Sequence, residues 1–457
     1  MKRLFLVFVT IVFASCSFDN KTGIWKDASI TSVENQTTKP ITENKSGTRY
    51  EDIYIKNQTF NEEKETNNSS NIELTVPVKI TNWSEQYAIP TNNISNFSYN
   101  DNKVLLLKSR KLSKLSSSKN FSNKKIIFYK NNLISHDHRG TIFIYSLNLN
   151  KKIFEYNFYK KSFKNFNKEI NLIANENILY AADNLGYLYA LDLDKKSIIW
   201  AKNYGIPFRS NLKFANNQIF AANQDNVIFS VNINTGDKNW QYQTSLTFLK
   251  SDFKNSFALD LINNNLFFLN TSGELYSINY LTQNINWVLN FKTTSLAGDT
   301  ELFLSHPIVI KNNNLIITTE KAVISYDTLT ASRNWYLSVE PIFKPIITAN
   351  YTYVISKNDL LICIDNINGN VVWSKNIFKN TKNKKIKKKF EAVADFKIVN
   401  SKINVYSKNG YLLSFNSSNG NLNYLSRISK SGISSEIVFL NDNMLLIDKN
   451  NKLLKFN

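Results

Sequence analysis

Three histidines and two cysteines are the residues of this chain best suited to metal binding or nucleophilic chemistry. His136 and His138 flank Asp137, and alternate residues on a strand would share one face where a metal could bind. No further ligand is placed to complete such a site, so we favour a solvated turn that leads into Gly140. The sequence contains no Gly-rich phosphate loop and no Gly-x-Ser-x-Gly motif, so it indicates neither phosphate chemistry nor a serine hydrolase.

The two cysteines, Cys16 and Cys363, are too few for a disulfide framework. Cys363 stands in the apolar run 360–364, whereas a reactive thiol needs an electropositive and accessible setting. The sequence therefore predicts that Cys363 is a small buried hydrophobic residue.

The N-terminus has the layout of a cleavable secretory signal. Lys2 and Arg3 precede the apolar stretch 4–13, which is too short to span a bilayer durably. Residues 13–16, Phe-Ala-Ser-Cys, also resemble the bacterial lipobox, in which the cysteine becomes the acylated first residue of the mature protein. The resemblance implies a signal peptide at 1–15 and lipidation of Cys16, and the alternative is an ordinary signal peptide with a chance cysteine.

Residues 16–75 are expected to form a lipidated flexible tether. Asn, Thr, Lys, Glu and Ser dominate this stretch, which therefore cannot bury enough apolar surface to offset its chain entropy. The residue after Cys16 is Ser17 rather than the Asp that commonly retains lipoproteins in the inner membrane. We therefore expect the protein at the periplasmic face of the outer membrane, held there by its lipid anchor.

The rest of the chain, 76–457, contains a repeat. Aromatic residues recur 38 to 51 residues apart, a range that matches one four-stranded propeller blade per unit; they are Phe154, Trp200, Trp240, Trp287, Trp335, Trp373 and Tyr424. Eleven residues before each aromatic lies an apolar residue, at Phe143, Tyr189, Phe229, Tyr276, Ile324, Ile362 and Leu413. Within each unit, apolar and polar residues alternate as they do in a half-buried β-strand. The spacing varies only between units, where loops can lengthen.

Two further positions of each unit favour turns. Fourteen residues before the aromatic stand Gly140, Gly186, Asn226, Gly273, Lys321, Asp359 and Gly410, which suit the entry to a strand. Eight residues before it stand Ser146, Asp192, Asn232, Asn279, Asp327, Asp365 and Asn416, whose side chains cap turns by bonding the backbone two residues on. We predict that six of the seven tryptophans, all except Trp25, pack between neighbouring blades.

An eighth unit begins with Asn451, Leu454 and Asn457, and the sequence ends before an outer strand could follow. Trp83 precedes Ile89-Pro90 just as Trp200 precedes Ile206-Pro207, so we expect 79–85 to supply that strand. The predicted fold class is all-β: an eight-bladed β-propeller of four-stranded antiparallel blades, closed by an N-terminal strand so that no sheet edge is left at the junction.

Units such as 187–200 and 227–240 resemble the tryptophan repeat of the quinoprotein-like propellers, which include enzymes and scaffolds. With a lipobox, one domain and eight units, the whole chain resembles the BamB family of lipoproteins of the outer-membrane β-barrel assembly machinery. That resemblance implies a non-enzymatic scaffold without cofactor. It also implies binding to the periplasmic domains of the central barrel-forming subunit, with unfolded outer-membrane protein clients as a further candidate partner.

In that family an inter-blade loop with a Ser-Leu-Thr-apolar-basic stretch contacts the central subunit. Here Ser245 and the expected partner-binding residues follow Trp240 at the corresponding place; these are Leu246, Thr247, Phe248, Leu249 and Lys250. The basic residue falls one position late, because Leu249 stands where a basic residue is usual. The alternative is that this stretch is a strand opening the next blade. A weaker match to a second, acidic contact loop runs from Asp299 to Glu301, ahead of Pro307.

The net charge of +20 favours anionic lipid headgroups or acidic polypeptides as partners, and nucleic acid is not an expected partner in the periplasm. Seven lysines lie between Lys379 and Lys389, which we expect to form a surface loop. Two other functions stay open at this point. One is a quinoprotein-type dehydrogenase, which would need acidic, Asn and Arg groups around a calcium ion and usually adjacent cysteines over the cofactor. The other is an envelope lipoprotein that binds glycan or peptidoglycan.

Overall fold

A computed structural model of the chain describes residues 16–18, 25–27, 59–66, 72, 74–113, 125–159, 163, 166–245, 254–291, 303–379, 390 and 392–457. The chain divides into two units, Met1–Lys56 and Asn57–Asn457. In the first unit, the described residues form β1 (Cys16–Phe18) and β2 (Trp25–Asp27), which pair antiparallel. No helix among the described residues is long and apolar enough to cross a membrane.

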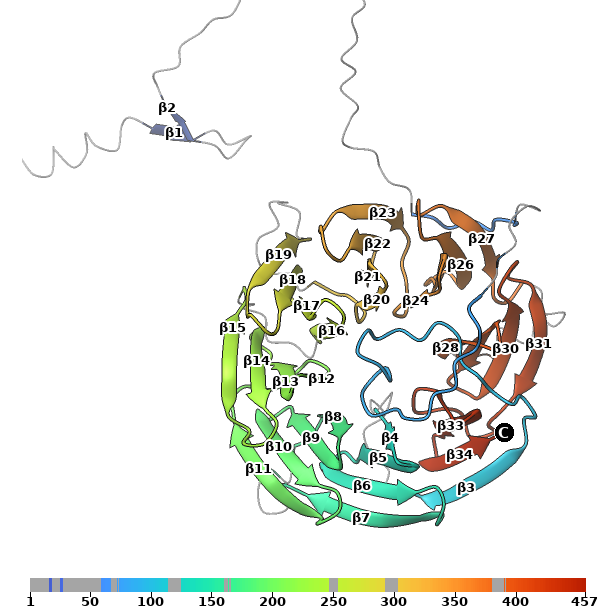
Figure 1. The fold of residues 1–457 in the computed structure, drawn as a ribbon. Helices are drawn as coiled ribbons and strands as arrows, with labels where there is room; N and C mark the ends of the chain where they lie inside the picture. Colours follow the sequence, from blue (N-terminus) through green and yellow to red (C-terminus); the bar gives the residue numbers. More distant parts are fainter. Residues whose placement is uncertain are drawn as a thin grey trace, which may run out of the picture. The chain divides into compact units, whose positions relative to one another are not determined.

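The second unit is an eight-bladed β-propeller, as the sequence predicts (Figure 1). Every blade is a four-stranded antiparallel sheet in which the strands follow one another from the central channel to the outer rim. The blades are numbered in chain order, and each is given from its inner to its outer strand. Blade 1 consists of β4 (Ile127–Tyr129), β5 (Asn132–His136), β6 (Thr141–Ser146) and β7 (Lys151–Asn157), and blade 2 of β8 (Ile170–Asn175), β9 (Ile178–Asp183), β10 (Tyr187–Asp192) and β11 (Ser197–Asn203). Blade 3 consists of β12 (Lys213–Ala215), β13 (Gln218–Ala222), β14 (Val227–Asn232) and β15 (Lys238–Gln243), and blade 4 of β16 (Ser256–Asp260), β17 (Asn265–Leu269), β18 (Glu274–Asn279) and β19 (Ile285–Asn290).

The remaining four blades continue in the same order. They consist of β20 (Val309–Lys311), β21 (Asn314–Thr318), β22 (Ala322–Asp327) and β23 (Arg333–Ser338); β24 (Ile346–Ile347), β25 (Tyr351–Ile355), β26 (Leu360–Asp365) and β27 (Val371–Asn376); β28 (Val393–Val399), β29 (Lys402–Ser407), β30 (Tyr411–Asn416) and β31 (Leu422–Arg427); β32 (Val438–Leu440), β33 (Asn443–Ile447), β34 (Lys452–Phe456) and β3 (Leu105–Lys111).

The repeated sequence positions recur at one place in seven of the eight blades. Each repeat aromatic lies in the outer strand, and the apolar residue eleven positions earlier lies buried or nearly so in the third strand. The predicted turn caps are present: the Asp192 carboxylate, for example, accepts hydrogen bonds from the backbone N–H groups of Asp194 and Lys195 at 2.9 and 2.8 Å. A β-bulge follows the pairing partner of each aromatic, as between Ala190 and Leu191, and it increases the twist of the blade.

Tryptophans of the outer strands pack against the next blade, which confirms the predicted inter-blade role. The indole N–H of Trp200 donates to the carbonyl of Ile233 at 2.8 Å, and that of Trp335 donates to Asn366 at 2.9 Å. Gly236 has a positive φ of 72° and lies so close to Trp200 that a Cβ atom there would be 2.3 Å from the ring. A glycine at this turn is therefore required by both the backbone and the indole.

Ring closure uses a different strand from the one predicted. The outer strand of the eighth blade is β3, which pairs with β34, so the prediction that 79–85 forms it is wrong. Trp83 is instead fully buried, and its backbone exchanges two hydrogen bonds with Phe128 in β4 at 3.0 and 2.8 Å. The spacing from Trp83 to Ile-Pro imitates the repeat, but Trp83 pairs with the inner strand β4 and is buried there.

Residues 78–100, here called the inner belt, line the central channel and lie at the centre of Figure 1. The belt contacts the inner strand of every blade or the turn that follows it. Backbone carbonyls of the belt, for example, accept hydrogen bonds from Leu259 in blade 4 at 2.9 Å and from Ile310 in blade 5 at 3.0 Å. The Asn92 side-chain amide donates to the carbonyls of Phe257 and Ile308 at 2.7 and 2.8 Å. The belt therefore satisfies backbone groups that the inner sheet edges would otherwise leave unpaired.

Residues 59–66, here called the outer strap, pair with the outer strand of blade 6. The backbones of Lys64 and Ser374 exchange hydrogen bonds at 3.0 and 2.9 Å, and Phe60 donates to the carbonyl of Ser338 in blade 5 at 2.7 Å. Glu63 forms an ion pair with Lys379. The strap covers β27, which is mostly buried, whereas outer strands such as β15 and β19 alternate between exposed and half-buried residues.

Candidate functional site

The expected partner-binding loop connects blades 3 and 4. Its residues Leu246, Thr247, Phe248, Leu249 and Lys250 lie outside the described residues, as do Asp299 and Glu301 of the weaker second match. Both stems of the loop are described: Ser245 follows β15, and Lys254 precedes β16. The stems show how the propeller holds this loop.

The first stem is tied to blade 4 through Glu274. The Ser245 hydroxyl and backbone N–H donate to the Glu274 carboxylate at 2.6 and 3.3 Å. The same carboxylate accepts hydrogen bonds from the Asn270 amide at 2.9 Å and the Tyr276 hydroxyl at 2.8 Å. Although partial burial raises the pKa of Glu274, these hydrogen bonds outweigh it and lower the pKa. Glu274 therefore stays ionised and fixes the point at which the loop begins.

The second stem is held by buried amides. Asn226 is fully buried, and its side-chain oxygen accepts from Asn255 at 3.2 Å and from the hydroxyl of Thr271 at 3.1 Å. The Asn226 amide also donates to the carbonyl of Ser245 at 3.4 Å. One asparagine in the turn-entry position thus bridges both stems, so the base of the loop is well ordered.

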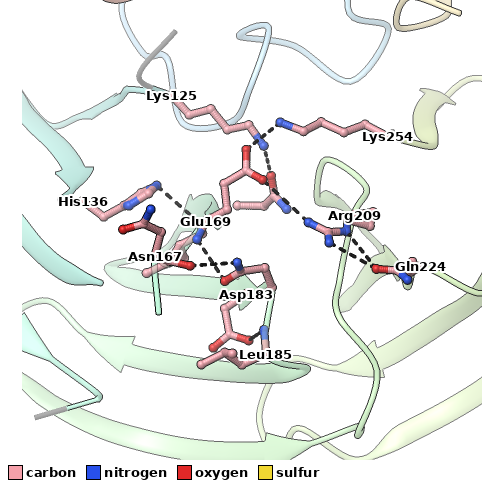
Figure 2. Close-up of polar contacts among 12 residues, drawn as sticks. Lys125, His136, Asn167, Glu169, Asp183, Leu185, Arg209, Gln224 and Lys254 are labelled. Atoms are coloured by element: carbon pink, nitrogen blue, oxygen red, sulfur yellow. Dashed lines mark hydrogen bonds and ion pairs between the residues drawn. The ribbon is translucent and has the colours of Figure 1, made fainter. Parts of the chain in front are cut away.

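Lys254 links the second stem to the channel mouth. Its ammonium lies 2.7 Å from the carboxylate of Glu169, which precedes the inner strand of blade 2. Arg209, before the inner strand of blade 3, lies 3.8 Å from the same carboxylate and also donates to Gln224 at 3.1 Å. Figure 2 shows Lys254, Arg209 and Lys125 converging on Glu169 from separate elements.

Cations outnumber the carboxylate in this cluster. Lys125 donates a hydrogen bond to the Asn171 side-chain oxygen and is close enough to Glu169 to act on its charge. Although burial raises the pKa of Glu169, the charges of Lys125 and Lys254 outweigh it and lower the pKa to about 2. Burial lowers the pKa of Lys125 to about 7. The loops of blades 1 to 4 therefore meet at one ionic cluster that carries surplus positive charge.

A cavity of about 350 Å³ continues from this cluster into the channel. Its walls include Lys125, Glu169 and Lys254 on one side and the belt residues Trp83 and Phe97 on another. Part of its polar wall is a buried ion pair in which Lys397 lies 2.8 Å from Asp395. Glu436 and Lys344 complete that wall, and Lys344 donates to the backbone carbonyl of Asn92 at 2.8 Å.

The described channel residues do not fit a calcium-bound quinone. Three carboxylates of this region are paired with cations: Glu85 lies 2.7 Å from Lys213, Asp395 pairs with Lys397, and Glu169 pairs with Lys254. Within the described ranges, no group of three or more histidine, cysteine, aspartate or glutamate side chains is placed to hold a metal ion. A divalent cation needs several free oxygen ligands, and carboxylates already bonded to ammonium groups are poor ligands.

The histidines have structural contacts. The expectation of a solvated turn is wrong for His136, which ends β5 and is 6% exposed. Its Nε2 accepts from the backbone N–H of Ile170 at 3.4 Å while Nδ1 lies 3.0 Å from the Asp137 carbonyl, so the neutral ring joins blades 1 and 2. Burial lowers the pKa of His136 and of His306.

Cys363 is fully buried in the core of β26, as predicted, and burial raises the pKa of its thiol. For Cys16 the structure describes only the backbone of β1, so lipidation stays a prediction. Of the lysine-rich stretch, Lys379 is described and 380–389 lie outside the described residues.

The channel cluster was missed by the sequence analysis. Its members are single lysines and carboxylates that precede the inner strands of different blades, where spacing varies from unit to unit. The available signal is a charged residue just before an inner strand, as at Lys125, Glu169, Lys254 and Glu436. In a chain this rich in lysine, that signal is hard to separate from ordinary surface charge.

The match to a known protein family lies within the repeat region. A family model described as "Outer membrane protein assembly factor BamB" matches residues 160–375. No curated protein sequence matches the chain.

Solved structures share the fold at low sequence identity. The crystal structure of BamB from Moraxella catarrhalis is 14% identical, with a TM-score of 0.58 over 76% of this chain and 99% of that chain. A quinohemoprotein alcohol dehydrogenase from Comamonas testosteroni is 7% identical, with a TM-score of 0.59 over 82% of this chain and 80% of that one. The computationally designed protein Ika8 is 12% identical, with a TM-score of 0.54 over 73% and 96%. At these identities the structural likeness concerns the fold alone.

Proposed function

We propose that this chain, which is a BamB-like β-propeller of PQQ-type repeats, is a non-enzymatic scaffold lipoprotein of the machinery that assembles outer-membrane β-barrel proteins. The observation that carries the proposal is the match of residues 160–375 to the BamB family model. The matched segment includes both stems of the predicted partner-binding loop. Function then lies in surfaces, since fold alone does not determine activity.

In this proposal Cys16 carries the lipid, and the residues after it tether the propeller to the periplasmic face of the outer membrane. The partner is the central barrel-forming subunit, and unfolded outer-membrane chains are further clients. The loop 246–250 supplies the contact, with Leu246 and Phe248 as apolar anchors and Lys250 as the neighbouring cation. The ordered stems at Ser245 and Lys254 support this role, because a fixed base lowers the entropy lost when a loop binds.

The second candidate is a quinoprotein dehydrogenase, which the structural likeness to the Comamonas testosteroni enzyme brings forward. The pairing of Glu85 with Lys213 and of Asp395 with Lys397 argues against it, because it occupies the carboxylates that a calcium site would need. Titration of the purified protein with pyrroloquinoline quinone and calcium, followed by absorbance, tests this candidate. Stoichiometric quinone binding would favour the enzyme.

The scaffold proposal is tested by affinity capture of the tagged, lipidated protein from solubilised outer membranes. Wild type is compared with Leu246→Asp/Phe248→Asp. The matched control is Ile262→Asp/Leu281→Asp, which changes two exposed apolar residues in the turns at the opposite end of blade 4. Circular dichroism and thermal melting establish that all three proteins fold.

We expect wild type and the control to recover the barrel-forming subunit and the loop variant to lose it. Loss of the subunit in both variants would argue against a specific role of the loop in binding. Absence of the subunit from all captures would argue against the proposal that this chain belongs to the assembly machinery. A glycan- or peptidoglycan-binding lipoprotein predicts instead that binding of purified peptidoglycan is abolished by charge reversal within 379–389.

A further inference from the structure

The channel cavity has an unbalanced set of charges. Of its lining groups, Lys254 pairs with Glu169 and Lys397 pairs with Asp395. The third carboxylate, Glu436, faces two further ammonium groups, those of Lys125 and Lys344. The lining thus carries four lysines against three carboxylates, a surplus of one positive charge.

Lys125 and Lys344 are the source of that surplus. Among the described residues neither forms an ion pair within 4.0 Å, and each donates to a neutral oxygen, the Asn171 amide and the Asn92 carbonyl respectively. Burial lowers the pKa of both lysines to about 7, and the carboxylates near them, which raise the pKa, do not offset that effect. A bound anion would supply a close counter-charge.

The rest of the cavity wall suits an apolar group. The rings of Trp83, Phe97, Phe343 and Phe396 line it, together with Ile94. The indole N–H of Trp83 is itself fully buried, so Trp83 offers the cavity its apolar ring. Convergent polar groups in a largely apolar concave site are typical of small-molecule binding.

The cavity is also reachable. Lys254 and Glu169, which line it, keep 45% and 41% of their side-chain surfaces exposed. A volume of about 350 Å³ lies in the lower part of the range for ligand pockets and holds one aromatic or branched aliphatic group with its polar end.

We propose that this cavity binds an organic monoanion, an apolar body bearing one carboxylate, with Lys125 or Lys344 as the counter-ion and the aromatic wall around the apolar part. The same chemistry is offered by a free small acid and by the C-terminal residue of a peptide. The proposal is independent of the scaffold role, because it uses none of the residues 246–250.

The test uses the full-length protein and isothermal titration with N-acetyl-L-phenylalanine and with its uncharged amide. We expect the acid to bind with a Kd below about 1 mM and the amide to bind at least tenfold more weakly. Equal binding of acid and amide, or no binding of the acid up to about 10 mM, would overturn the proposal. A ten-residue peptide that ends in phenylalanine identifies the source: tighter binding than the acid indicates a peptide C-terminus, and weaker binding indicates a free acid.

Two lysine variants locate the site. Lys344→Met or Lys125→Met should weaken binding of the acid at least tenfold, whereas Lys357→Met should leave it unchanged. Lys357 is a matched control because it loses the same charge from a side chain that is 73% exposed and paired with Glu340. Equal affinities in all three variants would place binding elsewhere and refute the site. Because the cavity lysines lie on separate elements, one of them remains informative if the other variant fails to fold.

Discussion

Removal of the Lys213 ammonium should destabilise the propeller strongly. Lys213 is fully buried, its partner Glu85 in the inner belt is 8% exposed, and the two charged atoms lie 2.7 Å apart. At an effective dielectric constant of about 20 the attraction at that distance is about 6 kcal/mol. Lys213→Met leaves the Glu85 carboxylate buried without a counter-charge, so we expect it to lower the free energy of unfolding by about 3–5 kcal/mol.

The double variant Glu85→Met/Lys213→Met separates charge pairing from packing. Replacing both charges with apolar groups of similar volume is often neutral, but Lys213 also donates to the carbonyl of Ile89 at 3.1 Å. Leaving that carbonyl unpaired costs about 1–3 kcal/mol, so the double variant should be more stable than Lys213→Met alone. Urea denaturation gives both values. A loss below about 1 kcal/mol in the single variant, or simple additivity of the two substitutions, would refute the reasoning.

Hydrogen exchange shows whether the same ion pair secures the belt. The amides of Leu259 and Ile310 donate to the belt carbonyls of Pro90 and Thr91. In Lys213→Met these two amides should exchange faster than amides in the middle strands of the same blades. Unchanged protection would mean that the belt is held independently of Lys213.

Three further predictions concern a turn, the channel and the strap. Gly236→Ala should lower the free energy of unfolding by about 2 kcal/mol or more, because its Cβ would lie 2.3 Å from Trp200 and its φ is 72°. Burial raises the pKa of Glu436 to about 7. The stability that protonated Glu436 contributes is therefore complete below its ordinary pKa near 4.5 and is lost as pH rises through 7. Glu436→Gln should therefore raise the melting temperature at pH 8 more than at pH 5. Burial raises the pKa of Glu63, but the hydrogen bond from Lys379 outweighs burial and lowers the pKa. The outer strap should therefore loosen as pH falls through this lowered pKa, and the Lys64 amide should exchange faster.

Each of these has its own control. Gly205→Ala has a similar positive φ of 78° but no atom within 4 Å of the added Cβ, so it should cost clearly less than Gly236→Ala, and equal losses would show that the indole contact is unimportant. Equal shifts of melting temperature at both pH values would contradict the assignment to Glu436. In Glu63→Gln the pH-dependent increase in exchange of the Lys64 amide, relative to its intrinsic rate, should be absent, and a persistent increase would point to another carboxylate.

The blades could be predicted from sequence because their repeat is local. The offset of eleven residues from Tyr189 to Trp200 spans one strand, one capped turn and one bulge, and the same geometry recurs in seven blades. Such offsets depend on backbone geometry within a hairpin, which the sequence specifies residue by residue. The capping role of Asp192 follows from the same local rule.

The closure and the candidate site could not be predicted in the same way. The strand β3 pairs with β34 across more than three hundred residues, and its register is interrupted by irregularities, so no periodic pattern marks it. The belt contacts all eight blades, and asparagines such as Asn92 bond backbone groups that are remote in sequence. The pairing of Lys213 with Glu85 likewise depends on how the belt passes through the channel.

The fold does not by itself separate a scaffold from an enzyme, since a BamB protein, a dehydrogenase and a designed protein match it with TM-scores between 0.54 and 0.59. In the channel of this chain, the inner belt bonds the inner strands, and lysines pair with the carboxylates of Glu85 and Asp395. A calcium site built on Asp395 or Glu85 would first have to release that carboxylate from its lysine, at the cost of leaving a buried ammonium unpaired. A scaffold has no such requirement, because its partners need only the outer surfaces and loops that the belt leaves free.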